Sequence, residues 1–198
     1  MKKILFVNAC VNRDISRTDR LARTVLDHIS ADDDLVLELV LEELGLQPLD
    51  SERLDRRSAA IERGDFSDAL FDQAKQLKEA DVVLIAAPYW DFSFPANLKI
   101  YFELLCAQGV TFTYGEDGTP RALCRGTNLY YVTTAGGYLG EYNYGFDQAK
   151  ALFELYFGFE KSVCVAAEGL DIVTNDAAAI MDEALEAVRL LQGAQAGG

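Results

Sequence analysis

The sequence predicts a three-layer α/β protein, with helices on both faces of a five-stranded parallel sheet. Five short apolar runs, rich in Val, Ile, Leu and Tyr, are typical of strands that are buried on both faces. Amphipathic helical patterns lie between these runs, and strands that alternate with helices indicate a doubly wound sheet. No internal repeat or low-complexity linker interrupts the alternation. The 198 residues, 50% of them hydrophobic, are therefore expected to form a single domain over residues 1–198.

The predicted elements alternate along the whole chain. The strands are expected at residues 3–9, 35–39, 82–87, 128–134 and 161–167. The helices are expected at residues 17–30, 67–80, 95–108, 145–158 and 175–192. The first helix places Leu21, Val25 and Leu26 on one face, which is the stripe that an amphipathic helix buries. Residues 193–198 are expected to form a frayed tail.

Two insertions break this rhythm. Residues 41–66 are long and mixed, contain Pro48, and are expected to form a surface excursion with an extra short helix. Residues 110–123 have an alternating pattern, a turn with two glycines and a return, which predicts a small hairpin. We expect this hairpin to lie beside the loop over residues 88–95 and to roof a pocket there.

The composition argues against several classes of protein. A net charge of −14 opposes binding to nucleic acid, because affinity for a polyanion comes from Lys and Arg. Acidic clusters such as Asp32 to Asp34 are expected to keep the surface solvated. No apolar run approaches the roughly 18 residues that a membrane span needs, and the chain starts directly in a strand. A cytoplasmic protein without a membrane segment is expected.

Cysteine and histidine usage gives little support for a metal site or a nucleophilic triad. The four cysteines are widely and irregularly spaced, which favours free thiols over a disulfide framework or a zinc site. A triad with a histidine base would have to be built on the single histidine, His28, which lies near the end of a helical pattern. Neither a Gly-x-Ser-x-Gly motif nor a phosphate loop ending in Gly-Lys-Ser/Thr occurs.

The loop after the first strand is a candidate anion site. Ser16 and Thr18 stand at the start of the first predicted helix, where unpaired N–H groups and the helix dipole favour a phosphate. Arg13 and Arg17 add positive charge to this loop. Routine capping of the helix by Ser16 is the alternative interpretation.

The loop after the third strand, residues 88–95, has the sequence Pro-Tyr-Trp-Asp-Phe-Ser-Phe-Pro. A cluster of aromatic residues at the carboxyl edge of a parallel sheet, where ligands bind, suits a planar cofactor. After the fourth strand, Gly136 and Gly137 allow a close backbone approach to a ligand, although an ordinary tight turn would also explain them. In the strand order 2-1-3-4-5, strands one, three and four are adjacent, so these three loops are expected to meet.

Five segments together resemble one family. They are Ser16-Arg17-Thr18, residues 88–95 leading into Leu98-Lys99-Ile100-Tyr101-Phe102, residues 109–114, Thr134-Ala135-Gly136-Gly137, and Ala167-Glu168-Gly169. This set is similar to the flavodoxin-like FMN-dependent NAD(P)H:quinone oxidoreductases, which include the bacterial azoreductases. The proline-bounded aromatic loop followed by Leu-Lys-x-Tyr-Phe is the most specific of these marks.

The resemblance implies a cofactor, a reaction and a set of site residues. FMN would be bound, NADH or NADPH would donate two electrons by a ping-pong route, and quinones, azo compounds or related flat aromatic molecules would accept them. No side chain need be catalytic, because the flavin N5 carries the chemistry. The phosphate would be held by Ser16, Arg17 and Thr18, and the isoalloxazine ring by Pro88, Tyr89, Trp90, Asp91, Phe92, Thr134, Ala135, Gly136 and Gly137. Tyr114, in the hairpin, would border the substrate pocket. Family members are homodimers with shared sites, so Phe157 or Phe159 would enter the partner's pocket.

The sequence departs from the family pattern at three places. Ala9 and Cys10 stand where hydroxyl residues are common, Asp91 stands where Asn is usual, and Ala135 stands where an azoreductase can carry Arg. A carboxylate near the flavin would disfavour the anionic reduced form and lower its potential. Two other functions remain open: a non-catalytic flavodoxin-like electron carrier, and a flavin-binding regulatory protein.

Overall fold

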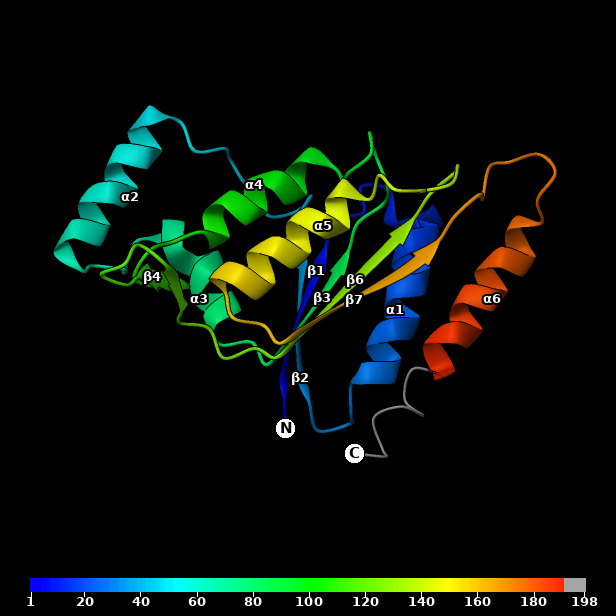
Figure 1. Cartoon of the computed structure of the whole chain (residues 1–198), viewed down its shortest axis with the longest axis horizontal. Coiled ribbons are helices and arrows are strands. Elements are labelled where there is room, and N and C mark those ends of the chain that lie inside the picture. The colour runs from blue at the N-terminus through cyan, green and yellow to red at the C-terminus, as the bar shows by residue number, and fades with distance from the viewer. Residues whose placement is uncertain (191–198) are drawn as a thin grey trace.

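The computed structural model of the protein describes residues 1–190 and contains a five-stranded parallel sheet (Figure 1). Its strands are β1 (Lys3–Asn8), β2 (Leu35–Val40), β3 (Val82–Ala86), β6 (Asn128–Thr134) and β7 (Lys161–Ala167). They are hydrogen-bonded in the order β2-β1-β3-β6-β7, and every neighbouring pair is parallel. The predicted fold class and the strand order 2-1-3-4-5 are therefore confirmed.

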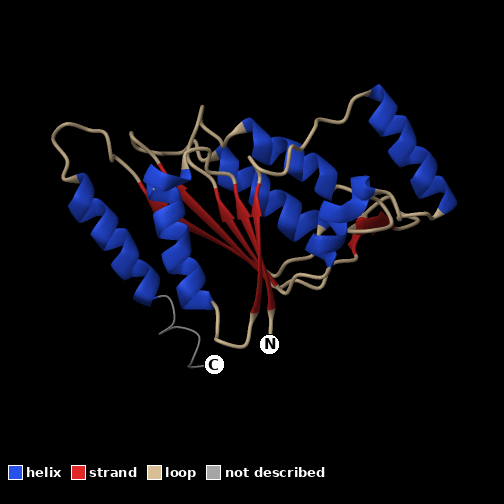
Figure 2. Ribbon diagram, turned by 180° about the vertical axis from the view of Figure 1, so that it is seen from behind, coloured by secondary structure: helices blue, strands red, loops and turns tan. Residues whose placement is uncertain are grey.

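Helices cover both faces of the sheet, as the view from behind shows (Figure 2). One face is covered by α1 (Arg17–Ile29) and α6 (Ala177–Leu190). The other is covered by α3 (Asp72–Lys78), α4 (Ala96–Leu105) and α5 (Tyr144–Ala151), and α5 continues into a π-helical turn over Leu152–Tyr156.

The core lies in two layers, one on each side of the sheet. Within β3, Val83 and Ile85 belong to the layer under α3, α4 and α5, whereas Val82 and Leu84 belong to the layer under α1 and α6. All five residues of β3 are buried, which is why its sequence is a continuous apolar run. Such a sheet is a rigid base for the loops that leave its carboxyl edge.

Several helices differ in length from the sequence-based prediction. The helix in the first insertion, α2 (Ser51–Arg63), is 13 residues long instead of short. It is capped by Asp50 at its start and by Gly64 at its end, and its only buried residue is Ala60. The helix expected at residues 67–80 becomes α-helical only at Asp72, after a 3-10 turn over Ala69–Phe71. Residues 191–198, which include the end of the last predicted helix and the predicted tail, lie outside the described residues.

The predicted hairpin forms from β4 (Phe112–Tyr114) and the antiparallel β5 (Pro120–Ala122). It lies at the far end of α4 from residues 88–95, because the ten residues of α4 carry the chain about 15 Å towards the other edge of the sheet (Figure 1). Phe112 packs against Tyr156 with 5.0 Å between ring centroids. The expectation that this hairpin roofs a pocket beside the aromatic loop is therefore wrong within one protomer.

A helix that crosses a bilayer must be long and predominantly apolar. Among residues 1–190, no helix is both long and apolar enough to span a membrane.

Candidate functional site

The loops that follow β1, β3 and β6 meet at the carboxyl edge of the sheet around a cavity of about 490 Å³. Six of the site residues predicted from the sequence line this cavity: Ser16, Arg17, Thr18, Pro88, Trp90 and Thr134. The predicted adjacency of β1, β3 and β6 is what brings these loops together.

The first loop supplies hydroxyl groups and a helix N-terminus. A short 3-10 turn over Arg13–Ile15 leads to Ser16, whose Oγ accepts a hydrogen bond of 3.1 Å from the backbone N–H of Asp19. Ser16 therefore does cap α1, and its hydroxyl hydrogen can still be donated to a ligand. The Oγ1 atoms of Thr18 and Thr134 are 2.6 Å apart, which joins the first loop to the loop after β6.

The aromatic loop is a tight two-residue turn. The backbone N–H and carbonyl groups of Trp90 and Ser93 bond to each other at 3.2 and 2.7 Å, and the two residues between them have positive φ, 51° at Asp91 and 64° at Phe92. This geometry matches the hairpin turns that favour Asn, Asp and Gly, so Asp91 has a backbone reason to be there. Trp90 and Phe92 are 49% and 59% exposed. The turn thus holds two flat side chains at the surface.

Tyr89 fastens the aromatic loop to the chain after β6. Its backbone N–H donates to the carbonyl of Thr134 at 3.0 Å, and its hydroxyl donates to the carbonyl of Tyr142 at 2.8 Å. The rings of Phe92 and Tyr142 meet edge to face, with centroids 6.0 Å apart. The two loops therefore form one connected wall.

Steric crowding requires glycine at the first position of the Gly136-Gly137 turn. A Cβ on Gly136 would lie 2.4 Å from Oδ2 of Asp171, whereas a Cβ on Gly137 would meet open space. Asp171 is held there because its N–H donates to the carbonyl of Gly136 at 2.9 Å. Ala135 is buried, so its methyl group points away from solvent.

Asp171 is a site residue that the sequence reasoning missed. It lies in the cavity wall, and its Oδ1 accepts a 2.8 Å hydrogen bond from Nη1 of Arg17 in an exposed ion pair. It follows β7, which neighbours β6, so the convergence of loops at the carboxyl edge would have found it. Val11, Asn12 and Ile15 were missed for lack of charge or aromatic character.

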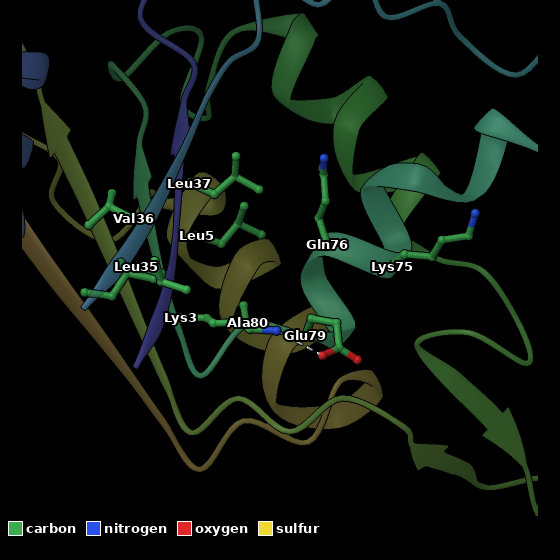
Figure 3. A pocket seen from close by; sticks show the side chains of 10 residues that line it. Lys3, Leu5, Leu35, Val36, Leu37, Lys75, Gln76, Glu79 and Ala80 are labelled. Atoms are coloured by element: carbon green, nitrogen blue, oxygen red, sulfur yellow. Dashed lines mark hydrogen bonds and ion pairs between the residues drawn. The ribbon is translucent and has the colours of Figure 1, made fainter. Parts of the chain in front are cut away.

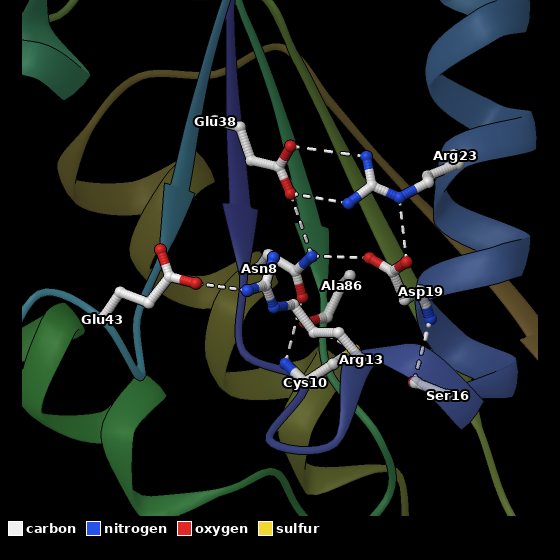
Figure 4. Close-up of polar contacts among 9 residues, drawn as sticks. All are labelled: Asn8, Cys10, Arg13, Ser16, Asp19, Arg23, Glu38, Glu43 and Ala86. Carbon is white, nitrogen blue, oxygen red and sulfur yellow. Dashed lines mark hydrogen bonds and ion pairs between the residues drawn. The ribbon is translucent and has the colours of Figure 1, made fainter.

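A partly buried polar network lies behind the first loop (Figure 4). It consists of Asn8 on β1, Glu38 on β2, and Asp19 and Arg23 on α1. Asn8 is fully buried and Asp19 is 8% exposed. No sequence motif indicates this network, because its members are far apart in the chain.

Two sequence-based expectations about individual residues are corrected. Ala9 and Cys10 are buried, and burial raises the pKa of the Cys10 thiol to about 11, so neither stands in the cavity as a replacement for a hydroxyl. Phe157 and Phe159 lie in the protomer's own core, where their rings pack on Phe153 with centroids 5.3 and 4.9 Å away. The hydrophobic effect holds them inside, so the expectation that they enter a partner's pocket is wrong.

A second hollow, of about 380 Å³, lies on β2, the strand at the edge of the sheet (Figure 3). Leu5, Leu35 and Leu37 line it on the side of α3, together with Lys3 and Glu79 at its end. It forms because α2 does not cover β2. Its wall contains neither the aromatic loop nor the start of α1, so it is separate from the cavity at the carboxyl edge.

Comparisons with known proteins agree with this geometry. A family described as having a flavodoxin-like fold matches residues 2–191. The FMN-dependent NADH:quinone oxidoreductase of Vibrio vulnificus is 31% identical over 147 residues, covering 69% of this chain and 71% of that protein. FMN-dependent NADH:quinone oxidoreductase 2 of Clostridium acetobutylicum is 29% identical over 195 residues, covering 94% of this chain and 96% of the relative.

Solved structures with the same fold include two from Bacillus anthracis. An azoreductase from strain Sterne superposes with a TM-score of 0.84 at 22% identity, over 96% of this chain and 98% of the other. An FMN-dependent NADH-azoreductase from strain Ames Ancestor, in complex with FMN, superposes with a TM-score of 0.82 at 20% identity over the whole of both chains. The protein therefore belongs to the flavodoxin-like family, and its resemblance to the FMN-dependent NADH:quinone oxidoreductases is confirmed.

Proposed function

We propose that the protein is an FMN-dependent oxidoreductase that transfers two electrons from NADH or NADPH to quinones, azo compounds or related flat aromatic acceptors. The observation that carries this proposal is the meeting of a hydroxyl-rich helix N-terminus and an exposed aromatic turn in one cavity. Relatives named for FMN-dependent reduction of quinones align along almost the whole chain, which supports the same reaction.

The residues of the cavity fit FMN at both of its ends. Ser16, Thr18 and the first N–H groups of α1 form a donor set suited to a phosphate, and Arg17 adds a positive charge. At the other end, Trp90 presents a flat apolar surface in the cavity wall, and Phe92 adds a second exposed ring on the same turn. The absence of a side chain at Gly136 lets the third loop pack closely against Asp171 in the cavity wall. Bound FMN would supply the two-electron chemistry, since it can accept a hydride from a nicotinamide and reduce an acceptor.

The remaining assignments follow from these positions. We propose that Pro88, Tyr89, Asp91, Thr134, Ala135 and Gly137 complete the binding surface for the isoalloxazine, mainly through the backbone. Among them, Tyr89 connects two loops through its hydrogen bonds, and the side chain of Ala135 points away from solvent. The protein's own tasks are to bind, orient and shield the cofactor, and to offer the acceptor a flat apolar slot.

We also propose that the protein is a homodimer. Within one chain the aromatic wall is left open, because Phe92, Tyr142 and Tyr144 are each more than half exposed. Tyr114, on the distant hairpin, would border a cavity only if it came from a partner. Four free thiols and a nicotinamide donor fit a cytoplasmic location. Light scattering on the purified protein tests the dimer, and a monomer at micromolar concentration would contradict it.

An electron carrier is the alternative function. A carrier needs an open flavin edge, and within a protomer the hairpin lies at the far end of α4 and leaves the cavity edge open (Figure 1). The names of the relatives favour an enzyme. Steady-state turnover separates the two: protein loaded with FMN should oxidise NADH in the presence of a benzoquinone. A rate no higher than that of free FMN would contradict the proposed function.

A further inference from the structure

The partly buried network behind the first loop contacts that loop at both of its ends (Figure 4). At the first end, the side-chain Oδ1 of Asn8 accepts a 3.1 Å hydrogen bond from the backbone N–H of Cys10. At the second end, Asp19 donates its backbone N–H to Oγ of Ser16 at 3.1 Å. Six residues between Cys10 and Asp19 line the cavity, among them Ser16, Arg17 and Thr18.

Side-chain bonds connect the two ends beneath the loop. Nδ2 of Asn8 donates to Oδ1 of Asp19 at 2.6 Å and to Oε1 of Glu38 at 3.1 Å. Nε of Arg23 donates to Oδ2 of Asp19 at 2.9 Å, and its Nη2 donates to Oε1 of Glu38 at 2.9 Å. β1, β2 and α1 are thereby locked to one another at the point where the loop leaves the sheet.

The chemistry of this network is unusual for a part of the molecule whose only task is to be stable. A fully buried amide and a nearly buried carboxylate are costly to desolvate, and apolar side chains of the same volume would fill the space at least as well. A fully satisfied polar network instead specifies one arrangement of the groups around it. The loop it specifies here carries Ser16 and Thr18.

We propose that Asn8, Asp19, Arg23 and Glu38 are positioning residues for the cofactor phosphate, acting through the loop over residues 10–18. The inference rests on the proposed function, because it assumes that the phosphate of FMN binds at the start of α1. None of the four lines the cavity wall, so they act through Cys10 and Ser16.

A purely electrostatic role for the same residues predicts the opposite effect. Asp19 and Glu38 carry two negative charges against the one positive charge of Arg23, so the network has a net charge of −1 close to where a phosphate would bind. If repulsion dominated, removing the charge of Asp19 would strengthen FMN binding. If positioning dominates, the same change weakens it, because the bonds to Asn8 and Arg23 are lost or misdirected.

FMN and riboflavin differ only in the phosphate, so their affinities separate positioning of the phosphate from general damage. We would measure both dissociation constants by calorimetry for the wild type, Asp19→Asn, Asp19→Ala and Glu38→Gln. The Asp19 variants should weaken FMN binding by about tenfold and riboflavin binding by less than about twofold. Glu38→Gln, which keeps an acceptor for Arg23, should show a smaller loss with the same selectivity.

The matched control is Asp182→Ala. Asp182 lies on α6 and forms an exposed ion pair with Arg20, which is on α1 like Asp19, with 3.7 Å between the charged atoms. It should leave both affinities unchanged. Equal losses of affinity for FMN and riboflavin would show that the network has only a structural role. Tighter FMN binding would show that charge repulsion dominates. Unchanged affinities in all network variants would contradict the proposal. If the Asp19 variants do not fold, Glu38→Gln decides by the same criteria. A wild-type protein that binds neither ligand would instead refute the proposed function.

Discussion

The two ends of the cavity are built in opposite ways. At the start of α1, the hydroxyl groups of Ser16 and Thr18 are held by partly buried hydrogen bonds, and Thr18 is only 1% exposed. At the aromatic turn, the backbone is equally constrained, but Trp90 and Phe92 project into solvent. We infer that the polar end sets how tightly the cofactor is held, and that the aromatic end sets what stacks against it.

The largest effect is expected when the hydroxyl groups of the polar end are removed. Ser16→Ala combined with Thr18→Ala should weaken FMN binding by about 30-fold, since two hydrogen bonds to a charged group are lost. Riboflavin binding should change much less, and the loss of the cap should lower the unfolding free energy by about 1 kcal/mol. Calorimetry with both ligands checks this.

The control for that pair is Thr24→Ala with Ser58→Ala. Thr24 is half-buried and Ser58 is exposed, and each hydroxyl donates to a carbonyl one helical turn back. Unchanged FMN affinity in Ser16→Ala/Thr18→Ala would mean that Ser16 only caps α1 and does not bind the phosphate.

At the aromatic end, we expect the selectivity to disappear. Trp90→Ala should weaken FMN and riboflavin binding alike, by about fivefold, because stacking involves the ring system that both ligands share. Fluorescence quenching of the flavin measures both constants. A loss confined to FMN would show that Trp90 acts near the phosphate, and would break the proposed division between the two ends.

Asp171 tests whether the polar end can be improved. Asp171→Asn removes a carboxylate from the cavity wall and frees Arg17, so FMN binding should tighten by about two- to threefold. The gain should shrink at high salt, because the ion pair is exposed. Weaker binding in the variant would mean that Arg17 needs Asp171 to be oriented.

Asp91 tests the aromatic end without changing its shape. Asn tolerates the same positive φ, so Asp91→Asn should leave the turn intact. Removing the charge should raise the midpoint potential of the bound flavin by on the order of 20 mV. Spectroelectrochemical titration measures this, and a potential that stays the same or falls would place the carboxylate away from the ring.

The sheet could be predicted because its signal is local and its topology follows from general rules. Continuous apolar runs such as β3 mark strands that are buried on both faces, and the strand order then brings the three loops together. The position of the hairpin could not be read in this way, since it depends on the length and direction of α4. An aromatic residue likewise gives no sign of whether it faces a pocket or the core, and Phe157 and Phe159 fill the core. The network of Asn8, Asp19, Arg23 and Glu38 could not be predicted, because β1, β2 and α1, which carry these residues, come together only in the folded protein.

Two properties of the cavity are decisive: the ligand that it binds, and the end of the cavity that binds the phosphate. Calorimetric titration of the cofactor-free wild-type protein with FMN, and separately with riboflavin, measures both. We predict one FMN site per chain, with an affinity for FMN at least about tenfold higher than that for riboflavin. Equal affinities, or no binding of either flavin, would contradict the assignment of the start of α1 as the phosphate site.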